Sequence, residues 1–300
     1  MQLFKNTLSI NFINHTSKTG IISLLLFISA ICILFFQGLN LTIEFRGGTN
    51  FNIVVPNTPI NEFRSNIQET LQQNITIVKV GDNNLVSNFL LRMKFIEDET
   101  LVVQSLRTIY PDLEIKSINS FGPKLGEELQ TSARNAILMA LLLISIYIAI
   151  RFDRYYALGS VIALIHDVII TVGILSILNV EIGISIIAAL LTIVGYSLND
   201  TIVVYDRIRE NINKFLDDNK QSIVNRALNE TLNRTVITSF TTLAVMIILF
   251  FFGGDVLKPF SLTLIIGILI GTYSSLYVAS PIMLYFEEKY PIPEFIDEEA

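Results

Sequence analysis

Six windows of the chain are almost free of charged side chains. They lie at residues 19–43, 135–150, 155–180, 182–199, 235–254 and 259–286, and His166 and Asp167 are the only acidic or basic residues inside any of them. A helix that crosses a membrane needs about 20 predominantly apolar residues. We therefore predict an α-helical polytopic membrane protein with six transmembrane helices, the first at 19–37 and the other five within 131–286.

The first window has two interpretations. Lys5 and Lys18 precede an apolar stretch, as they would in a cleaved signal peptide. The residues after Phe36 lack a small-x-small cleavage pattern, and the apolar stretch is long for a signal peptide. We expect an uncleaved membrane anchor.

Residues 38–130 have the mixed composition of one small domain. Alternating apolar residues predict strands at 50–55, 75–80, 86–95 and 113–118 with a turn at 81–84, and helical patterns are found at 59–72 and 98–110. The order strand-helix-strand-strand-helix-strand is that of an α+β ferredoxin-like (βαββαβ) fold. This segment contains no histidine and no cysteine, so we expect a folded module that contacts another molecule.

The positive charges indicate the orientation of the chain. Ten lysines and arginines lie before the first span, between the second and third, and between the fourth and fifth, whereas the short loops on the other side hold only Lys258. Cytoplasmic loops carry the excess of Lys and Arg. We expect a cytoplasmic N-terminus at 1–18, a periplasmic domain at 38–130 and an acidic cytoplasmic tail at 287–300.

The composition removes several classes of function. Hydrophobic residues make up 51% of the chain and charged residues 16%, against roughly 25% charged in an average soluble domain. A net charge of −6 offers no basic surplus for binding nucleic acid. With one cysteine, two histidines and no GxxxxGK[ST] phosphate loop, we expect no metal, no cofactor and no enzyme activity.

Asp200 directly follows the fourth window, and the apolar residues 202–204 after it extend the predicted span, so that Asp200 lies inside the membrane. It precedes Asp206, which marks the cytoplasmic end of that span, by six residues, or about 9 Å of helix. An ionisable residue inside a membrane costs about 2.5–3.5 kcal/mol on insertion scales and is by default a functional hypothesis. A structural ion pair is the plainer interpretation; we favour a protonatable carboxylate that carries charge through the membrane.

Three further residues bear on this hypothesis. Arg234 directly precedes the fifth window. It would act either as the counter-ion to Asp200 or as an ordinary cytoplasmic anchor at a helix end. An arginine does not readily lose its proton, so it would tune the acid rather than carry the proton. His166 and Asp167 lie near the centre of the third span, where a proton relay and a satisfied structural pair are both open interpretations.

Other residues of the spans are candidates for proton conduction or helix packing. Tyr196 and Asn199 accompany Asp200 on the fourth span and are weaker proton-conduction candidates. Gly195 permits close approach of a neighbouring helix, and Gly267 and Gly271 form a small-xxx-small contact on the sixth span.

A resemblance to the SecF branch of the SecD/SecF family extends over nearly the whole chain. Its strongest part is the run GYSLNDTIVVYDRIREN at 195–211. Shorter matches are FGPKLG at 121–126, RF at 151–152, ALIHD at 163–167 and NRT at 233–235. The segment 38–49 is also similar, but Thr42 and Glu44 replace the usual Gly and Asp, which leaves the role of that acid open.

The resemblance implies a function and a set of partners. SecF proteins pair with SecD, a larger relative, in an assembly related to RND transporters, of which this chain would be half. The pair is thought to use the proton-motive force to promote preprotein translocation across the bacterial inner membrane after the ATP-driven step of SecA. It associates with the SecYEG channel and with YajC and YidC, and the positions of Asp200 and Arg234 are implicated in proton passage.

Two other classes of function stay open. An RND-type small-molecule exporter would also use an intramembrane Asp, although such exporters usually carry both halves in one chain. A non-motor scaffold subunit of the translocon would use the charges only structurally. An Asp200→Asn substitution separates the motor from the scaffold.

Overall fold

The computed structural model describes residues 9–71, 75–83 and 86–290. Lys5, residues 72 and 84 of the predicted helix and turn, and residues 291–300 of the acidic tail lie outside the described residues. The chain divides into two compact units, one at Leu41–Arg134 and the other formed by Met1–Asn40 and Asn135–Ala300. Helix α5 runs through the boundary between them.

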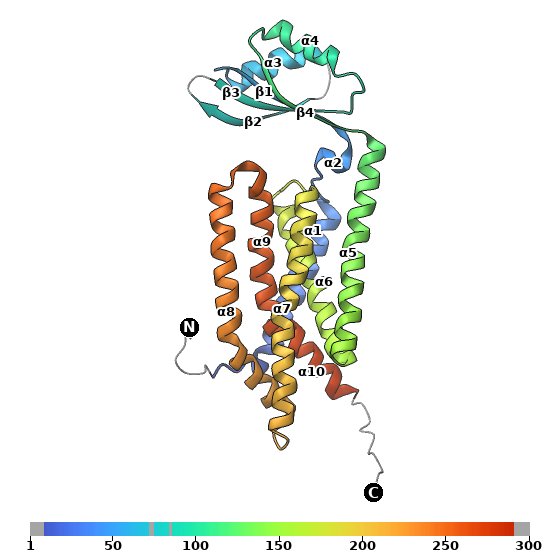
Figure 1. Ribbon diagram of the computed structural model, residues 1–300, viewed down its shortest axis with the longest axis vertical. Helices are drawn as coiled ribbons and strands as arrows, with labels where there is room; N and C mark the ends of the chain where they lie inside the picture. The colour runs from blue at the N-terminus through green and yellow to red at the C-terminus, as the bar shows by residue number, and fades with distance from the viewer. Residues whose placement is uncertain (1–8, 72–74, 84–85, 291–300) are drawn as a thin grey trace. The chain divides into compact units, whose positions relative to one another are not determined.

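The unit at 41–134 contains a four-stranded antiparallel sheet with strand order β2-β3-β1-β4. Helices α3 and α4 lie on one face of this sheet (Figure 1). In chain order the elements are α2 (Ile43–Arg46), β1 (Gly48–Pro56), α3 (Ile60–Leu71), β2 (Thr76–Asn83), β3 (Val86–Met93), α4 (Thr100–Ile109) and β4 (Glu114–Phe121).

Alternation along the strands directs apolar side chains toward the helices. Phe51 and Ile53 of β1 and Phe89 and Leu91 of β3 are fully buried, because successive side chains of a strand point to opposite faces. Phe63 of α3 stacks on Phe89 with ring centroids 4.1 Å apart. The sheet and its two helices therefore enclose a core of their own.

The predicted turn at 81–84 is wrong for the residues that the structure describes. Gly81–Asn83 continue β2, with Gly81 opposite Asn88 and Asn83 opposite Val86. A register shift between Lys79 and Gly81 marks a bulge. An extra bulged residue lets a strand remain paired through a run whose composition favours a turn.

Six helices among the described residues are long and apolar enough to cross a membrane, the number that the hydrophobic pattern predicts. The last of them is continuous but contains a π-helical segment, η2. The six are α1 (Thr16–Phe36), α5 (Pro123–Arg151), α6 (Arg154–Ile177), α7 (Ile184–Lys214), α8 (Lys220–Phe252) and the run α9 (Gly254–Ser274), η2 (Ser275–Ala279) and α10 (Ser280–Lys289).

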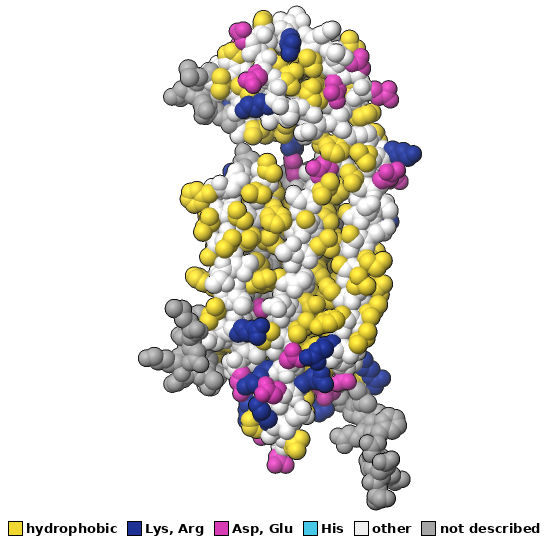
Figure 2. All heavy atoms as spheres, in the orientation of Figure 1, with side chains coloured by type: hydrophobic (Ala, Val, Ile, Leu, Met, Phe, Trp, Pro, Cys, Tyr) yellow, Lys and Arg dark blue, Asp and Glu magenta, His cyan; other side chains and the backbone are white. Residues whose placement is uncertain are grey.

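Several helices extend beyond the windows that predicted them. Helix α5 begins at Pro123, and α7 and α8 extend toward each other until the connection between them is only residues 215–219. These extensions are polar, and the space-filling view shows acidic and basic side chains gathered at this end of α7 and α8, with hydrophobic side chains over the middle of the helices (Figure 2). An ion pair between Arg207 and Glu230 joins the two extensions, and apolar side chains such as Ile208 and Leu228 are buried in them.

Small residues set the closest helix contacts in the helical unit. A Cβ added to Gly173 of α6 would lie 2.6 Å from Cβ of Ala30 on α1. A Cβ added to Gly159 would lie 2.6 Å from the Ala279 carbonyl oxygen. Helix α6 is thus held tightly between α1 and the last helix.

Candidate functional site

Asp200 is buried in α7 at 3% exposure. Two groups of α8 act on its carboxylate, the positive charge of Arg234 and the hydroxyl of Ser239. Its Oδ2 atom has no hydrogen-bond partner among the described residues. A buried carboxylate oxygen without a partner is costly in a folded protein. A structural role alone therefore does not account for burying this acid.

Helices α7, α8 and α9 meet around this acid. Arg234 is exposed on α8 and acts on Asp200 through its charge rather than through a hydrogen bond. One turn further on, the Ser239 hydroxyl shares a hydrogen bond of 2.7 Å with the Thr272 hydroxyl of α9. The Asp200 site thus has a charged, exposed side and a hydroxyl-lined, buried side.

Asp167 forms a second buried polar centre, on α6, at 1% exposure. Its Oδ2 accepts hydrogen bonds from Ser197 of α7 at 2.6 Å and from Ser274 of α9 at 2.7 Å. Its Oδ1 lies 2.9 Å from Nδ1 of His166. The His166 ring stacks on Phe27 of α1, and its Nε2 has no hydrogen-bond partner among the described residues. The structure therefore brings the adjacent His166 and Asp167 into one hydrogen-bonded pair.

Sequence reasoning missed the hydroxyl groups that serve the two acids. The residues predicted for proton conduction do not include Ser197, Ser239, Thr272 or Ser274. Ser197 lies three residues before Asp200, which places the two one turn apart on α7. The spacing draws attention to Ser197 but does not reveal its hydrogen bond to Asp167 on α6.

Tyr196, Asn199 and Gly195 lie on the part of α7 that precedes Asp200. The Tyr196 hydroxyl is buried without a partner among the described residues, whereas Asn199 is exposed. A Cβ added to Gly195 would meet nothing within 4 Å. Close approach of a helix at Gly195 is therefore not provided by the described residues and stays a prediction.

Gly267 and Gly271 of α9 face α7. A Cβ added to Gly267 would lie 2.1 Å from Cδ1 of Ile193, and one added to Gly271 would lie 3.0 Å from Cβ of Ser197. The glycines therefore set a short distance between α7 and α9 on the side where Ser197 bonds Asp167.

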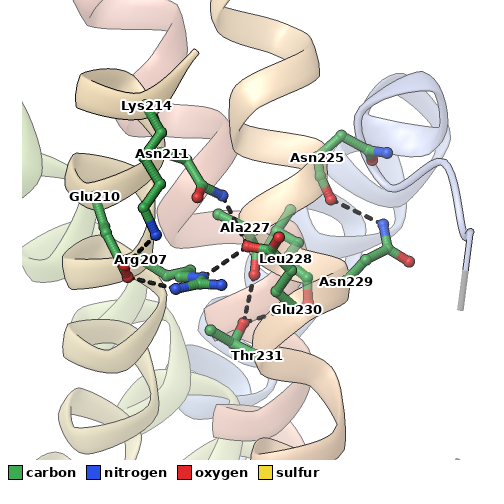
Figure 3. A network of polar contacts seen from close by, with 10 residues as sticks. All are labelled: Arg207, Glu210, Asn211, Lys214, Asn225, Ala227, Leu228, Asn229, Glu230 and Thr231. Carbon is green, nitrogen blue, oxygen red and sulfur yellow. Dashed lines mark hydrogen bonds and ion pairs between the residues drawn. The ribbon is translucent and has the colours of Figure 1, made fainter. Parts of the chain in front are cut away.

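A polar network joins the extensions of α7 and α8 beyond Asp200 and Arg234 (Figure 3). Glu230 of α8 accepts hydrogen bonds from Nε of Arg207 at 2.6 Å and from Nδ2 of Asn211 at 2.8 Å, both on α7. Glu210 pairs with Arg207 and, at 2.5 Å, with Lys214. Hydrogen bonds and an ion pair thus join α7 and α8, the two helices that carry Asp200 and Arg234, in their extensions.

Two asparagines of α8 hold the segment that precedes α1. Asn229 accepts a hydrogen bond from the Ile10 N–H and donates one to the Ile10 carbonyl, each at 2.8 Å. Asn225, which Figure 3 shows beside Asn229, accepts from the Phe12 N–H at 2.7 Å. The Phe12 side chain is buried at 3% exposure. The start of the first span is therefore tied to the helix that carries Arg234.

The described residues hold no group of three or more His, Cys, Asp or Glu side chains that could bind a metal ion. The buried polar groups around Asp200 and Asp167 are carboxylates, hydroxyls and one imidazole. Such groups accept and donate protons and hydrogen bonds, so the chemistry that they offer is proton binding.

Comparison with known proteins agrees with this architecture. Residues 101–289 match the family described as "Protein export membrane protein SecD/SecF, C-terminal". A protein translocase subunit SecF from Rhodothermus marinus is 41% identical over 293 residues, which is 95% of both chains. A protein of the same name from Escherichia coli O157:H7 is 42% identical over 272 residues, covering 88% of this chain and 83% of that one.

Solved structures extend the likeness to the fold. A SecDF from Thermus, described as a translocon-associated membrane protein, superimposes with a TM-score of 0.83 at 38% identity over 96% of this chain. A SecDF in a super-membrane-facing form gives a TM-score of 0.73 at 36% identity. This chain spans 40% of each of those solved chains.

The six apolar helices and these relatives define the class as a multi-pass inner-membrane protein. Within that class the chain belongs to the SecD/SecF family of protein-export membrane proteins.

Proposed function

We propose that this chain is an accessory subunit of the Sec translocase that, with SecD, uses the proton-motive force to promote preprotein translocation after the ATP-driven step of SecA. Its relatives are named protein translocase subunit SecF. The observation that carries the proposal is the buried Asp200 carboxylate under the influence of the Arg234 charge. A scaffold that neither binds nor releases protons has no need of an acid that is so costly to bury.

The proposed orientation puts both termini in the cytoplasm and the unit at 41–134 in the periplasm. Support comes from Arg151, Arg207, Lys214 and Arg226, which lie at the helix ends that would then be cytoplasmic, in keeping with the excess of positive charge on that side of a membrane. The element order and the strand order β2-β3-β1-β4 support a ferredoxin-like fold for the periplasmic module.

SecD is the partner that we propose for the exposed polar surface of α7 and α8. Asn199 and Arg234 are exposed on helices that are apolar enough to cross a membrane, and a Cβ added to Gly195, one turn before Asn199, would meet nothing within 4 Å. Polar groups in a membrane usually face other helices rather than lipid. Association with the SecYEG channel, SecA, YajC and YidC completes the proposal and rests on the family resemblance of residues 195–211.

The proposed cycle alternates the charge of Asp200. A proton that enters from outside neutralises the carboxylate and weakens its attraction to Arg234, and release to the cytoplasm restores that attraction. One proton moved down a potential of 100 mV supplies about 2.3 kcal/mol. That energy biases a two-state equilibrium roughly fifty-fold. Repeated shifts of α7 against α8 would then move the periplasmic module against an emerging polypeptide.

The test compares Asp200→Asn with Asp206→Asn in cells that export a secreted reporter. Asp206 is the matched control, because it lies on the same helix but is 47% exposed in a surface pair with Arg151. We expect Asp200→Asn to abolish the export that depends on the proton gradient while SecD still co-purifies, and Asp206→Asn to preserve both. Unchanged export in the Asp200→Asn cells would show that the charges are structural and that the chain is a scaffold.

A further inference from the structure

The Asp167 carboxylate connects three of the packed helices. It lies on α6 and accepts hydrogen bonds on a single oxygen, Oδ2, from Ser197 of α7 and Ser274 of α9, at 2.6 and 2.7 Å. The two serines are 2% and 0% exposed, so no bulk water competes for their hydroxyls. Hydrogen bonds from donors to a charged carboxylate are shorter and stronger than those between neutral groups.

Both oxygens of Asp167 have partners, which distinguishes this acid from Asp200. Oδ1 of Asp167 contacts Nδ1 of His166 at 2.9 Å, whereas Oδ2 of Asp200 has no hydrogen-bond partner among the described residues. An acid that is held by three donors is suited to fixing the helices around it. An acid with an open oxygen is suited to exchanging a proton.

Ser197 places one of these hydrogen bonds close to Asp200. Three residues of α-helix separate the two positions by about 4.5 Å along α7 and about 60° around its axis. Gly271 and Gly267 of α9 face Ser197 and Ile193, and they set how closely α7 approaches. The contacts with glycine set a distance but no direction. The directional hydrogen bond at Ser197 also favours one rotation of α7 about its own axis.

We propose that the Asp167–Ser197 hydrogen bond positions Asp200 by setting the rotation of α7, so that the Asp200 carboxylate faces Arg234 and Ser239 of α8. This inference rests on the proposed function of Asp200. Asp167 and Ser197 are positioning residues in it, and neither exchanges the proton. If the bond is lost, α7 turns more freely and the attraction between Asp200 and Arg234 no longer has one fixed geometry.

The proton affinity of Asp200 depends on its position relative to the groups around it, so it changes when α7 rotates. Arg234 of α8 is the charge that acts on Asp200, and the His166–Asp167 pair of α6 is bonded to Ser197, which lies one turn before Asp200 on α7. The tyrosines of the last helix are engaged elsewhere: the Tyr273 hydroxyl donates to the Thr19 carbonyl of α1, and the Tyr277 ring packs on Phe12. A change in the position of α7 therefore acts on Asp200 mainly through its separation from Arg234.

The test compares Ser197→Ala with Ser274→Ala in the complex with SecD. Each substitution removes one buried hydroxyl and one hydrogen bond to the same oxygen, but only Ser197 is on the helix that carries Asp200. The readout is the pH dependence of proton-gradient-driven export in membrane vesicles. We expect Ser197→Ala to move the pH midpoint and Ser274→Ala to leave it at the value of the unsubstituted protein, with similar losses of thermal stability in both. Equal shifts, or no shift in either variant, would overturn the inference.

Two additions keep the test decisive. Ser197→Cys keeps the shape of the side chain, with a somewhat larger atom that is a much weaker donor, and it replaces Ser197→Ala if that variant does not assemble with SecD. Asp200→Asn, measured in the same vesicles, separates the two proposals. If Asp200→Asn does not affect export, the proposed function itself fails; if it stops export but Ser197→Ala behaves as Ser274→Ala does, the positioning inference alone fails.

Discussion

Replacing Gly159 by Ala tests the packing on which the helical unit depends. A Cβ at this position of α6 would lie 2.6 Å from the Ala279 carbonyl oxygen and 2.7 Å from the Tyr205 hydroxyl oxygen. The Tyr205 hydroxyl itself donates to that carbonyl at 3.2 Å, and Tyr205 is fully buried. The new methyl group therefore meets backbone on one side and a hydrogen bond between α7 and η2 on the other, and neither has free space to move into.

The size of the effect follows from three contributions. Forcing a methyl group into a packed interior costs about 1–3 kcal/mol. Weakening the Tyr205 hydrogen bond costs about 0.5–1.5 kcal/mol. The better helix propensity of Ala returns about 1 kcal/mol. The net loss is about 0.5–3.5 kcal/mol, and at about 2–4 °C per kcal/mol the midpoint of thermal unfolding falls by about 1–14 °C.

The assay is thermal unfolding of the purified protein in detergent, with Gly20→Ala as the control. Gly20 lies in α1, where an added Cβ would meet nothing within 4 Å, so the helix propensity of Ala acts there alone. We expect Gly20→Ala to unfold at the same temperature as the unsubstituted protein or slightly above it. If Gly159→Ala unfolds at the same temperature as Gly20→Ala, the close contact of α6 with η2 does not exist in the folded protein.

Two further predictions concern other parts of the chain. Gly195→Leu should leave the thermal stability of the isolated chain unchanged, because the position faces open space. It should reduce co-purification of SecD if a partner helix packs there. Unaltered co-purification would refute close packing at Gly195. Hydrogen bonds from the Thr100 hydroxyl and N–H hold the pKa of Asp98 below its usual range. A depressed pKa in the folded state gives stability that is present at neutral pH and is lost as the pH falls through that pKa. The unfolding temperature of Asp98→Asn should therefore vary less between neutral and acid pH than that of the unsubstituted protein. An unaltered pH dependence of unfolding would contradict this.

Hydrophobic pattern was sufficient to predict the six long helices, because a membrane imposes length and apolar composition on each crossing segment separately. It was less informative at the helix ends. Residues 205–214 and 220–234 look like a polar loop in sequence but continue α7 and α8. There Ile208 and Leu228 are buried in the core of the helical unit, and Glu230 accepts hydrogen bonds from Arg207 and Asn211 across the two helices. Pairing of this kind depends on which helices are neighbours, which the pattern along one helix does not contain.

Asp200 could be singled out from the sequence because a charged residue in an apolar run is rare and its cost is local. The residues that surround Asp200 could not be identified from the sequence. Serines and threonines are common in apolar helices and often bond their own backbone, as Thr201 does to the Ser197 carbonyl, so their presence does not predict a partner on another helix. For the same reason His166 and Asp167 could be read either as a relay or as a structural pair.

The sequence by itself determined which segments are apolar enough to cross a membrane, which acids lie inside them, and the order of the four strands and of helices α3 and α4 in residues 41–134. The tertiary structure alone decided that Ser197 and Ser274 bond Asp167, that Gly267 and Gly271 face α7 while Gly195 faces open space, and that asparagines of α8 hold the chain ahead of α1. Burial cost and periodicity are properties of one segment. Hydrogen bonds and close contacts between helices depend on the distance and rotation of one helix relative to another, and these are set only when all of the helices pack together.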